Sequence, residues 1–379
     1  MRVVRQLYFA ISFLYLATCC PLSDGILWAR PAYGADANIP QLQAAAQKGF
    51  IPQQVQLAAA YFTGSGVTQD AKLAAYWYEK AAKSGDAEAE NQIGFLYQTG
   101  QGVHSDPARA FHWYQLSAAS GYVRAKVNLG VLYLWGIGVQ KNESLAADFF
   151  QQAAARGDGA AAGYLGDLYY FGKGVKLDKA ESDRWYSVGA RLHDPVSAFN
   201  LGTLLSVDSE HAHDLPRAAA LLRDSASAGY IHAMHSLGLL LTNHPEFALS
   251  AKESRSLLEK ASSGGSWRSS VVLGILARDG KGATPDPENA YYLFHLALLQ
   301  GGEPAARLLE NDLKALSAQL AADRITTIAA NADAWFAKHP FKLDTVYRID
   351  GNSRRFPAYA RAVAGDDVHA GQLVFPPPA

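Results

Sequence analysis

Residues 86–121, DAEAENQIGFLYQTGQGVHSDPARAFHWYQLSAASG, contain the pattern that decides the fold. Apolar residues with helical spacing lead into the glycine-rich stretch GQGV at 100–103. Asp106 and Pro107 then provide the residue types favoured at a helix N-cap and at the first helical position. A glycine-rich stretch before a helix is also typical of a phosphate-binding loop, so the alternatives are a nucleotide site and a turn.

The pattern recurs through the chain with a period of 36 residues. The first loop glycine recurs at Gly64, Gly100, Gly136, Gly172 and Gly280. The glycine six residues before it recurs at Gly94, Gly130, Gly166, Gly202, Gly238 and Gly274. An aromatic pair recurs at Trp77 and Tyr78, Trp113 and Tyr114, Phe149 and Phe150, and Trp185 and Tyr186. Seven units therefore occupy residues 50–301, and residues 38–49 match the second half of a unit.

One repeat position explains the loop. It holds residue types favoured as helix N-caps, namely Asp70, Asp106, Asn142, Asp178, Asp214, Ser250 and Asp286. The sequence thus predicts a helix, a Gly-x-Gly turn, an N-cap and a second helix in each unit, with the first glycine closing the first helix. A phosphate-binding loop follows a strand, whereas this loop follows a helix and occurs five times, so the turn is the preferred interpretation.

A single helix pair of this length cannot bury both of its apolar stripes, so successive pairs must stack. The predicted fold is all-α, a right-handed α-solenoid of stacked helix-turn-helix repeats with a concave inner face. A glycine in mid-helix costs about 1 kcal/mol relative to alanine, so its recurrence predicts close approach between helices. The aromatic pairs are predicted to lie in the core rather than to stack on a ligand.

The unit in residues 86–121 resembles the Sel-one-like repeat, a relative of the tetratricopeptide repeat, and the resemblance covers about two thirds of the chain. It implies an α-solenoid that mediates protein–protein or protein–glycan contacts, commonly in bacterial envelopes. A cysteine-rich branch of that family is linked to β-lactamase activity and has a disulfide in each repeat. The only cysteines here, Cys19 and Cys20, precede the repeats, so that activity is not carried over.

Units five and six depart from the pattern. Their loops, LSVDSEHAHD at 205–214 and LTNHPEFALS at 241–250, lack the Gly-x-Gly-Val stretch but keep the spacing. Altered loops are candidates for function. Histidines gather in this region, at His193, His211, His213, His232, His235 and His244. Their spacing matches no metal-binding signature, so no metal ligand is assigned.

Composition and motifs restrict the function. A net charge of −1 provides no basic surface for nucleic acid or an anionic membrane. The chain contains no nucleophile elbow, zinc-protease or kinase signature, so no catalytic residue and no cofactor are predicted. Paired carboxylates could hydrolyse a glycan, but nothing in the sequence selects a pair.

The N-terminal 37 residues are predicted to be a signal peptide. Arg2 and Arg5 precede an apolar run at 7–20 and the small-residue stretch PAYGADA at 31–37. Cleavage would place the chain in the periplasm or outside the cell. The alternatives are an uncleaved anchor in the inner membrane and, less favoured, a lipid anchor at the stretch LATC, residues 16–19, where Thr18 is a poor residue before Cys19.

The C-terminal part lacks the repeat. Residues 302–340 are predicted to form capping helices, one of them spanning Ser317 to Lys338. Residues 341–379 are predicted to be an extended or disordered tail because the helical periodicity ends and the segment closes with PPPA.

The partner-binding surface is predicted by analogy with tetratricopeptide repeats, whose concave face uses first-helix positions beside the Leu-Gly pair. Carried over, the binding residues are Glu88, Asn91, Phe95, Gln98, Arg124, Asp167, Tyr170, His232, His235, Arg268 and Arg278. An exposed Phe95 or Tyr170 would favour a protein interface, since aromatic and arginine anchors dominate such surfaces.

Two functions follow as hypotheses. The favoured one is an exported, non-enzymatic scaffold that binds a protein partner through its concave groove. The alternative is an envelope protein that binds or processes a glycan at the altered repeats five and six, which makes a polysaccharide the second class of partner. Membrane contact is expected only through an uncleaved signal or a lipid anchor.

Overall fold

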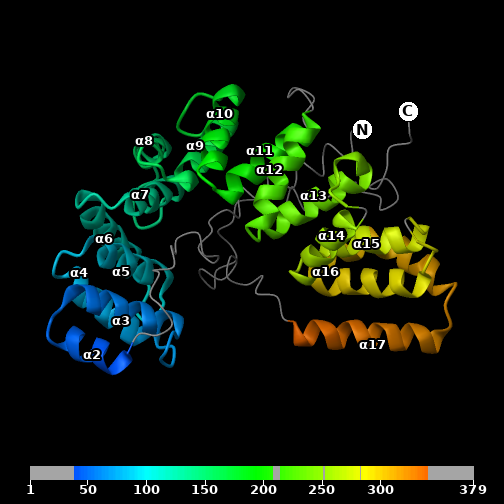
Figure 1. The fold of residues 1–379 in the computed structure, drawn as a ribbon, viewed down its shortest axis with the longest axis horizontal. Coiled ribbons are helices and arrows are strands. Elements are labelled where there is room, and N and C mark those ends of the chain that lie inside the picture. Colours follow the sequence, from blue (N-terminus) through cyan, green and yellow to red (C-terminus); the bar gives the residue numbers. More distant parts are fainter. Residues whose placement is uncertain (1–37, 208–213, 251, 282, 340–379) are drawn as a thin grey trace. The chain divides into compact units, whose positions relative to one another are not determined.

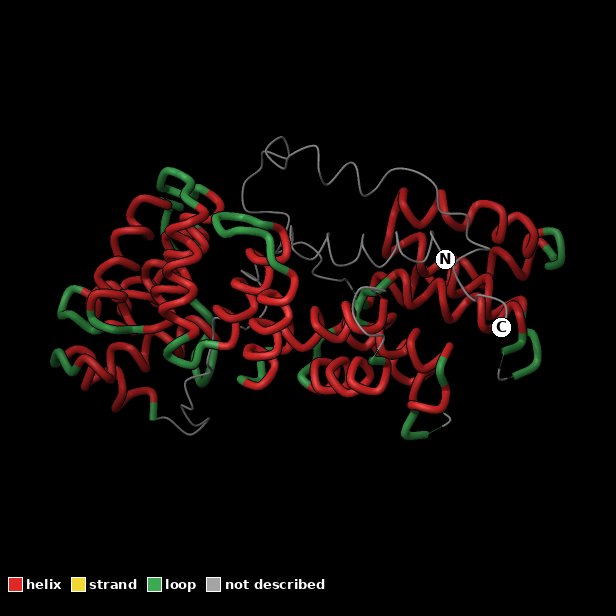
Figure 2. The backbone as a smooth tube through the Cα atoms, turned by 90° about the horizontal axis from the view of Figure 1, so that it is seen from above, coloured by secondary structure: helices red, strands yellow, loops and turns green. Residues whose placement is uncertain are grey.

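The computed structural model describes residues 38–207, 214–250, 252–281 and 283–339. Within these ranges the secondary structure is helical, α2 to α17 with the short 3-10 helix η1 (Pro245–Phe247), and contains no strand (Figures 1 and 2). No helix in this part of the chain is long and apolar enough to span a membrane. The predicted signal peptide and the predicted tail lie outside the described residues, and so do His211 and His213 of the fifth loop.

The first helices of the seven units confirm the period. Each has 13 residues, and each begins 36 residues after the one before. They are α3 (Ile51–Thr63), α5 (Ala87–Thr99), α7 (Val123–Trp135), α9 (Gly159–Phe171), α11 (Pro195–Val207), α13 (Ile231–Asn243) and α15 (Trp267–Asp279). The chain is therefore an all-α solenoid of repeats.

The second helices begin at the predicted N-caps with one exception. They are α4 (Ala71–Ala82), α6 (Pro107–Ala119), α8 (Glu143–Ala154), α10 (Lys179–Arg191), α12 (Leu215–Ser227), α14 (Glu253–Ser263) and α16 (Pro287–Ser317). Asp106, for example, accepts a hydrogen bond from the Arg109 backbone N–H at 3.0 Å. The prediction for Ser250 is wrong, since Lys252 is the N-cap of α14 and caps it without a side-chain hydrogen bond.

The ends of the repeat array are also helical. A half unit at the start forms α2 (Ile39–Gln47). At the other end α16 continues past a kink at Gly302 to Ser317, and α17 (Ala322–Lys338) follows. The predicted start of the last helix at Ser317 is wrong, because the chain is still in α16 there.

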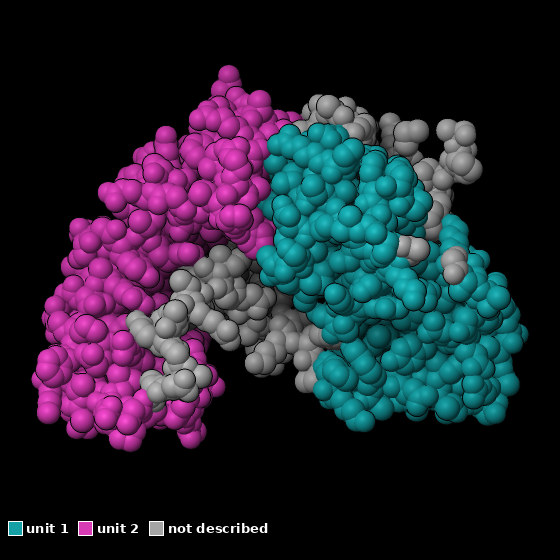
Figure 3. All heavy atoms as spheres, viewed as in Figure 1, with its two compact units in different colours: residues 1–19, 198–379 teal, residues 20–197 magenta. Residues whose placement is uncertain are grey.

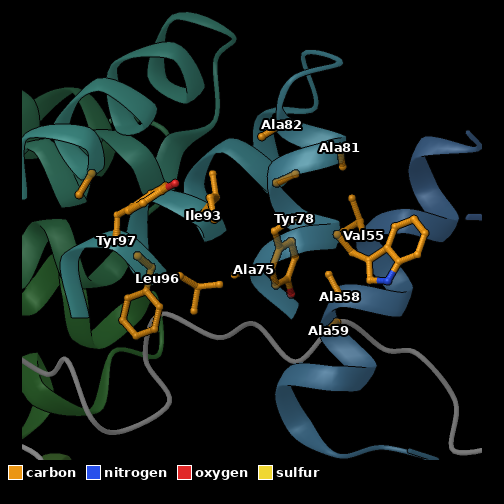
Figure 4. Close-up of a cluster of buried hydrophobic side chains, with 14 of the residues drawn as sticks. Val55, Ala58, Ala59, Ala75, Tyr78, Ala81, Ala82, Ile93, Leu96 and Tyr97 are labelled. Atoms are coloured by element: carbon orange, nitrogen blue, oxygen red, sulfur yellow. The ribbon is translucent and has the colours of Figure 1, made fainter. Parts of the chain in front are cut away.

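The described residues divide into two compact units, 38–197 and 198–339, coloured differently in Figure 3. The core of the first includes Tyr78, Ile93 and Leu96, which Figure 4 shows between neighbouring helices among small alanines. The core of the second includes Ile275 and Phe294. Each core continues from one helix pair to the next, as stacking of the repeats requires.

The mid-helix glycines explain how the pairs pack. A Cβ added at Gly94 would lie 2.9 Å from the ring of Tyr114, and one at Gly130 would lie 2.6 Å from the ring of Phe150. The ring of the second residue of the aromatic pair thus lies directly against the glycine, and Tyr114 and Phe150 are fully buried. Close approach of helices and a core role for the aromatic pairs are both confirmed.

Candidate functional site

The predicted binding residues separate into two groups by exposure. One group is buried and consists of Asn91, Phe95, Gln98, Tyr170 and His235. The other group is partly buried and consists of Glu88, Arg124, Asp167, His232, Arg268 and Arg278. A surface that binds a partner directly must draw on the second group.

The buried group takes part in packing. The Tyr114 hydroxyl donates to Gln98 Oε1 at 2.8 Å, and Asn128 Nδ2 donates to Asn91 Oδ1 at 2.8 Å. Phe95 is 4% exposed and Tyr170 is 9% exposed. The expectation of an exposed aromatic anchor at either position is not met, because these helices are covered on more sides than an amphipathic pattern suggests. In α5 every residue from 89 to 98 is buried.

Among the predicted binding residues of the first compact unit, Asp167 has the pKa that is shifted most from its usual value. Its Oδ1 accepts a hydrogen bond from the Tyr186 hydroxyl at 2.6 Å, and the Tyr186 side chain is buried. Burial raises the pKa of Asp167 to about 8, against the opposing effect of this hydrogen bond. Burial, reinforced by the neighbouring Asp167 charge, also raises the pKa of Tyr186 well above its usual value.

This perturbed carboxyl predicts a pH-dependent stability. The folded pKa lies above the usual value of 3.8, so the folded state holds an extra proton between the two values and its stability falls as pH rises from about 4 to 8. We expect Asp167→Asn to be more stable than the wild type at pH 9 by about 2 kcal/mol, which allows for the partial exposure of the residue, and no more stable at pH 4.

Urea denaturation followed by circular dichroism at both pH values measures this difference. Asp148→Asn, which changes an exposed carboxyl on α8, serves as the control and should follow the wild type. A stability gain at Asp167→Asn that is the same at both pH values would contradict the buried-proton account.

Two further carboxyls of the same unit were not predicted. Asp194 is buried and accepts hydrogen bonds from Ser197, at 2.7 Å from its N–H and 2.5 Å from its Oγ. Burial raises the pKa of Asp194 as well. Asp158 Oδ2 lies 3.4 Å from Arg124 Nε, and its Oδ1 caps α9 by accepting from the Ala161 N–H at 3.0 Å. The sequence could have identified both carboxyls, because Asp158 and Asp194 are 36 residues apart and therefore occupy the same repeat position.

In the second compact unit, three predicted residues form what we call the basic cluster: His232, His235 and Arg268. His235 Nδ1 shares a hydrogen bond of 2.9 Å with Ser269 Oγ, which ties α13 to α15. Burial, with a smaller contribution from the Arg268 charge, lowers the pKa of both histidines to about 3, and His235 contributes to the lowered pKa of His232 as well. Both rings are therefore neutral at pH 7. Arg268 therefore carries the charge of the cluster.

The remaining predicted residues contribute less. Arg278 is already paired, with Asp279 at 2.7 Å and with Asp312. Burial, followed by repulsion from Asp86, raises the pKa of Glu88. Arg278 would have to give up two acidic partners before it could bind an anionic ligand. Glu88 lies beside another acidic residue, Asp86.

The altered loop of unit six is held by an ion pair rather than by glycines. Arg223 Nε lies 2.9 Å from Glu253 Oε1, and Arg223 Nη2 donates to the Phe247 carbonyl at 3.0 Å. His244 Nδ1 lies 3.2 Å from Glu246 Oε1. Across the described parts of the chain, no three histidine, cysteine or acidic side chains are grouped so as to hold a metal ion.

Comparison with known proteins agrees with this architecture. The Sel1 repeat family model matches residues 54–86, 87–122, 123–158, 159–194 and 272–302. Units five and six fall largely outside the matched segments, although their first helices keep the 36-residue spacing. No curated protein matches the sequence.

Three solved structures are similar to the chain to different degrees. A Sel1 repeat protein from Oxalobacter formigenes is 30% identical, with 58% of this chain and 90% of that chain covered and a TM-score of 0.51. A protective antigen of uropathogenic Escherichia coli with an SLR fold is 20% identical, with 79% and 87% covered and a TM-score of 0.30. An immunity protein from Pseudomonas aeruginosa is 20% identical, with 70% and 84% covered and a TM-score of 0.39. The last two are too distant to carry an argument, but the repeat matches and the first structure show that the chain belongs to the Sel1 repeat family.

Proposed function

We propose that the protein is a non-enzymatic scaffold that binds a protein partner along the first helices of its repeats. Sel1 repeat proteins are generally scaffolds for protein interaction. The proposal adds where on this chain the partner binds and that no chemistry accompanies binding.

One observation carries the proposal. Six successive first helices have a partly exposed residue at the same repeat position, which we call the variable position. It holds Glu88, Arg124, Ala160, Val196, His232 and Arg268. The residue that follows it is a buried alanine or serine in every case: Ala89, Ala125, Ala161, Ser197, Ala233 and Ser269.

A scaffold of repeats must pack its helices closely, and it must also present a surface that selects a partner. The two neighbouring positions meet these two requirements separately. The small buried residue is constant because neighbouring helices must approach closely in every repeat. The residue at the variable position is partly exposed in each of these repeats, and it changes in charge and size from one repeat to the next. A row of chemically different side chains on a constant frame is the arrangement that selects one partner among many.

Cross-linking in the native cell, followed by affinity capture and mass spectrometry, tests the proposal. We expect the double variant Glu88→Ala with Arg268→Ala to lose most of a partner that the wild type captures. The control is Lys72→Ala with Arg255→Ala, which removes exposed charges from the second helices α4 and α14 and should retain the partner. Circular dichroism must first show that both variants are folded.

The outcomes are distinct. Equal capture by all three proteins would contradict binding at the variable position. The absence of any protein partner would contradict the scaffold proposal and favour the polysaccharide alternative. We also propose export to the periplasm or the exterior on the basis of the signal-like residues 1–37. The same mass spectra report this, because a mature chain that starts after residue 34, 35 or 37 indicates cleavage, whereas an intact N-terminus indicates an anchor.

A further inference from the structure

Within the part of the chain that the structure describes, the guanidinium group of Arg268 in the basic cluster is placed without a counter-charge. It lies in the first turn of α15 and stacks on Trp267, with its Cζ 4.5 Å from the ring centroid. Its Nε atom is buried and finds no hydrogen-bond partner in residues 38–207, 214–250, 252–281 and 283–339. No acidic group among the described residues forms an ion pair with it. Burial without a counter-charge lowers the pKa of Arg268 to about 10.

A second arginine at the same repeat position contacts a carboxylate. Arg124 occupies the variable position four repeats earlier, and its Nε lies 3.4 Å from Asp158 Oδ2. Asp158 is the N-cap of the following first helix. Asp158 lies 34 residues after Arg124, and the residue 34 positions after Arg268 is Gly302, which has no side chain.

The geometry at Gly302 explains why the counter-charge is missing there. Gly302 has φ 58° and ψ −136° at the kink of α16, a conformation that other residues rarely adopt. The next residue, Glu303, is directed to Arg307, with which it forms an ion pair. Arg268 therefore lacks the carboxylate that accompanies Arg124.

The groups around Arg268 do not replace that carboxylate. His232 and His235 are neutral, and His235 is bound to Ser269 Oγ. Ser269 Oγ also donates to Ser266 Oγ at 3.0 Å. The site thus offers one positive charge and neutral polar groups, which complements an anion of a single charge. A partly buried cation that lacks a partner is costly, so an anion that binds here is favoured by more than its contact alone.

We propose that Arg268 binds a carboxylate of the protein partner, in the role that Asp158 has beside Arg124. This inference rests on the proposed scaffold function and specifies the chemistry of the partner. The carboxylate belongs either to an acidic side chain or to the C-terminus of the partner, since both present the same planar anion to the guanidinium group.

The full chain labelled with 15N-arginine allows a direct test by NMR. The Arg268 Nε–H resonance is identified by its loss in Arg268→Gln and is then followed during titration with three small probes. N-acetylglutamate amide presents a side-chain carboxylate, N-acetylglycine presents a C-terminal carboxylate, and N-acetylglutamine amide is the neutral control. We expect a saturable shift with one or both carboxylates and none with the neutral probe. The carboxylate that produces the shift identifies the source.

Variants complete the test. Arg268→Lys keeps the charge but loses the planar fork, and we expect about tenfold weaker carboxylate binding, measured by isothermal titration. Arg255→Gln removes an exposed arginine from α14 and should bind as the wild type does. The inference is overturned by a shift that does not saturate, by an equal shift with the neutral probe, or by unchanged affinity in Arg268→Lys. Because the probes are small molecules, this result is independent of whether a protein partner is captured.

Discussion

Gly102→Ala is expected to destabilise the folded chain by about 3 kcal/mol or more, whereas Gly121→Ala is expected to cost only about 1 kcal/mol. Both glycines have positive φ, 73° and 85°, so alanine is strained at either position. At Gly102, however, an added Cβ would overlap the carbonyl group of Ala71, whereas nothing lies within 4 Å of such an atom at Gly121. The difference between the variants therefore measures the contact and not the dihedral angle.

Chemical denaturation followed by circular dichroism compares the two variants with the wild type. A repeat array need not unfold in one step, so the first transition is the quantity to compare. If Gly102→Ala shifts the transition no further than Gly121→Ala, the loop does not contact Ala71 as closely as described. Gly138 makes the equivalent contact with the Pro107 carbonyl, at 2.5 Å from an added Cβ to the oxygen, so Gly138→Ala should repeat the result.

This contact also marks what the sequence could and could not predict about the loop. The first glycine of the Gly-x-Gly turn was explained from the sequence, because helix ends favour the left-handed conformation, and Gly100 indeed caps α5 with φ 73°. The second glycine had no explanation, because the group it approaches belongs to the preceding repeat. A spacing within one unit contains no information on which backbone atoms of a neighbouring unit it will touch.

The same limit applies to helix boundaries and to the site. The 36-residue period predicted the starts of the first helices correctly. In unit six, however, the loop lacks the Gly-x-Gly stretch and the N-cap aspartate, and α14 begins at Glu253, three residues after Ser250. Analogy with related repeats placed Phe95 and His235 on a binding face, and both are buried. Helical periodicity identifies the buried side of a helix that packs on one neighbour, but a first helix in a solenoid packs on several.

The sequence predicts only part of the basic cluster. His232 and Arg268 were selected together, and they occupy the same position of adjacent repeats. What distinguishes Arg268 from Arg124 is the missing acid at residue 302, and this required the structure, because many other acidic residues could have served. The described residues leave Arg268 without such a partner, which is why one arginine is assigned to a ligand and the other to the fold.

Phe150→Ala is expected to cost about 3–5 kcal/mol, the range for removing a fully buried phenylalanine. The ring stacks on Tyr164 with centroids 4.6 Å apart and also lies against Gly130. Phe149, the adjacent residue, is only partly buried and stacks on Tyr133 at 5.7 Å. Phe149→Ala is therefore the matched control, and we expect it to cost about half as much. Denaturant titration at one pH measures both.

A double-mutant cycle then tests whether Gly130 is present because of that ring. Alone, Gly130→Ala should destabilise, since an added Cβ would lie 2.6 Å from the ring carbon Cε1 of Phe150. Combined with Phe150→Ala, the same change should be neutral or stabilising, because the ring is gone and alanine is the better helix former by about 1 kcal/mol. Additive effects would mean that the glycine is required by something other than Phe150. A coupling energy that favours the double variant would establish that the recurrent glycine and the recurrent aromatic residue form one packing unit, repeated along the solenoid.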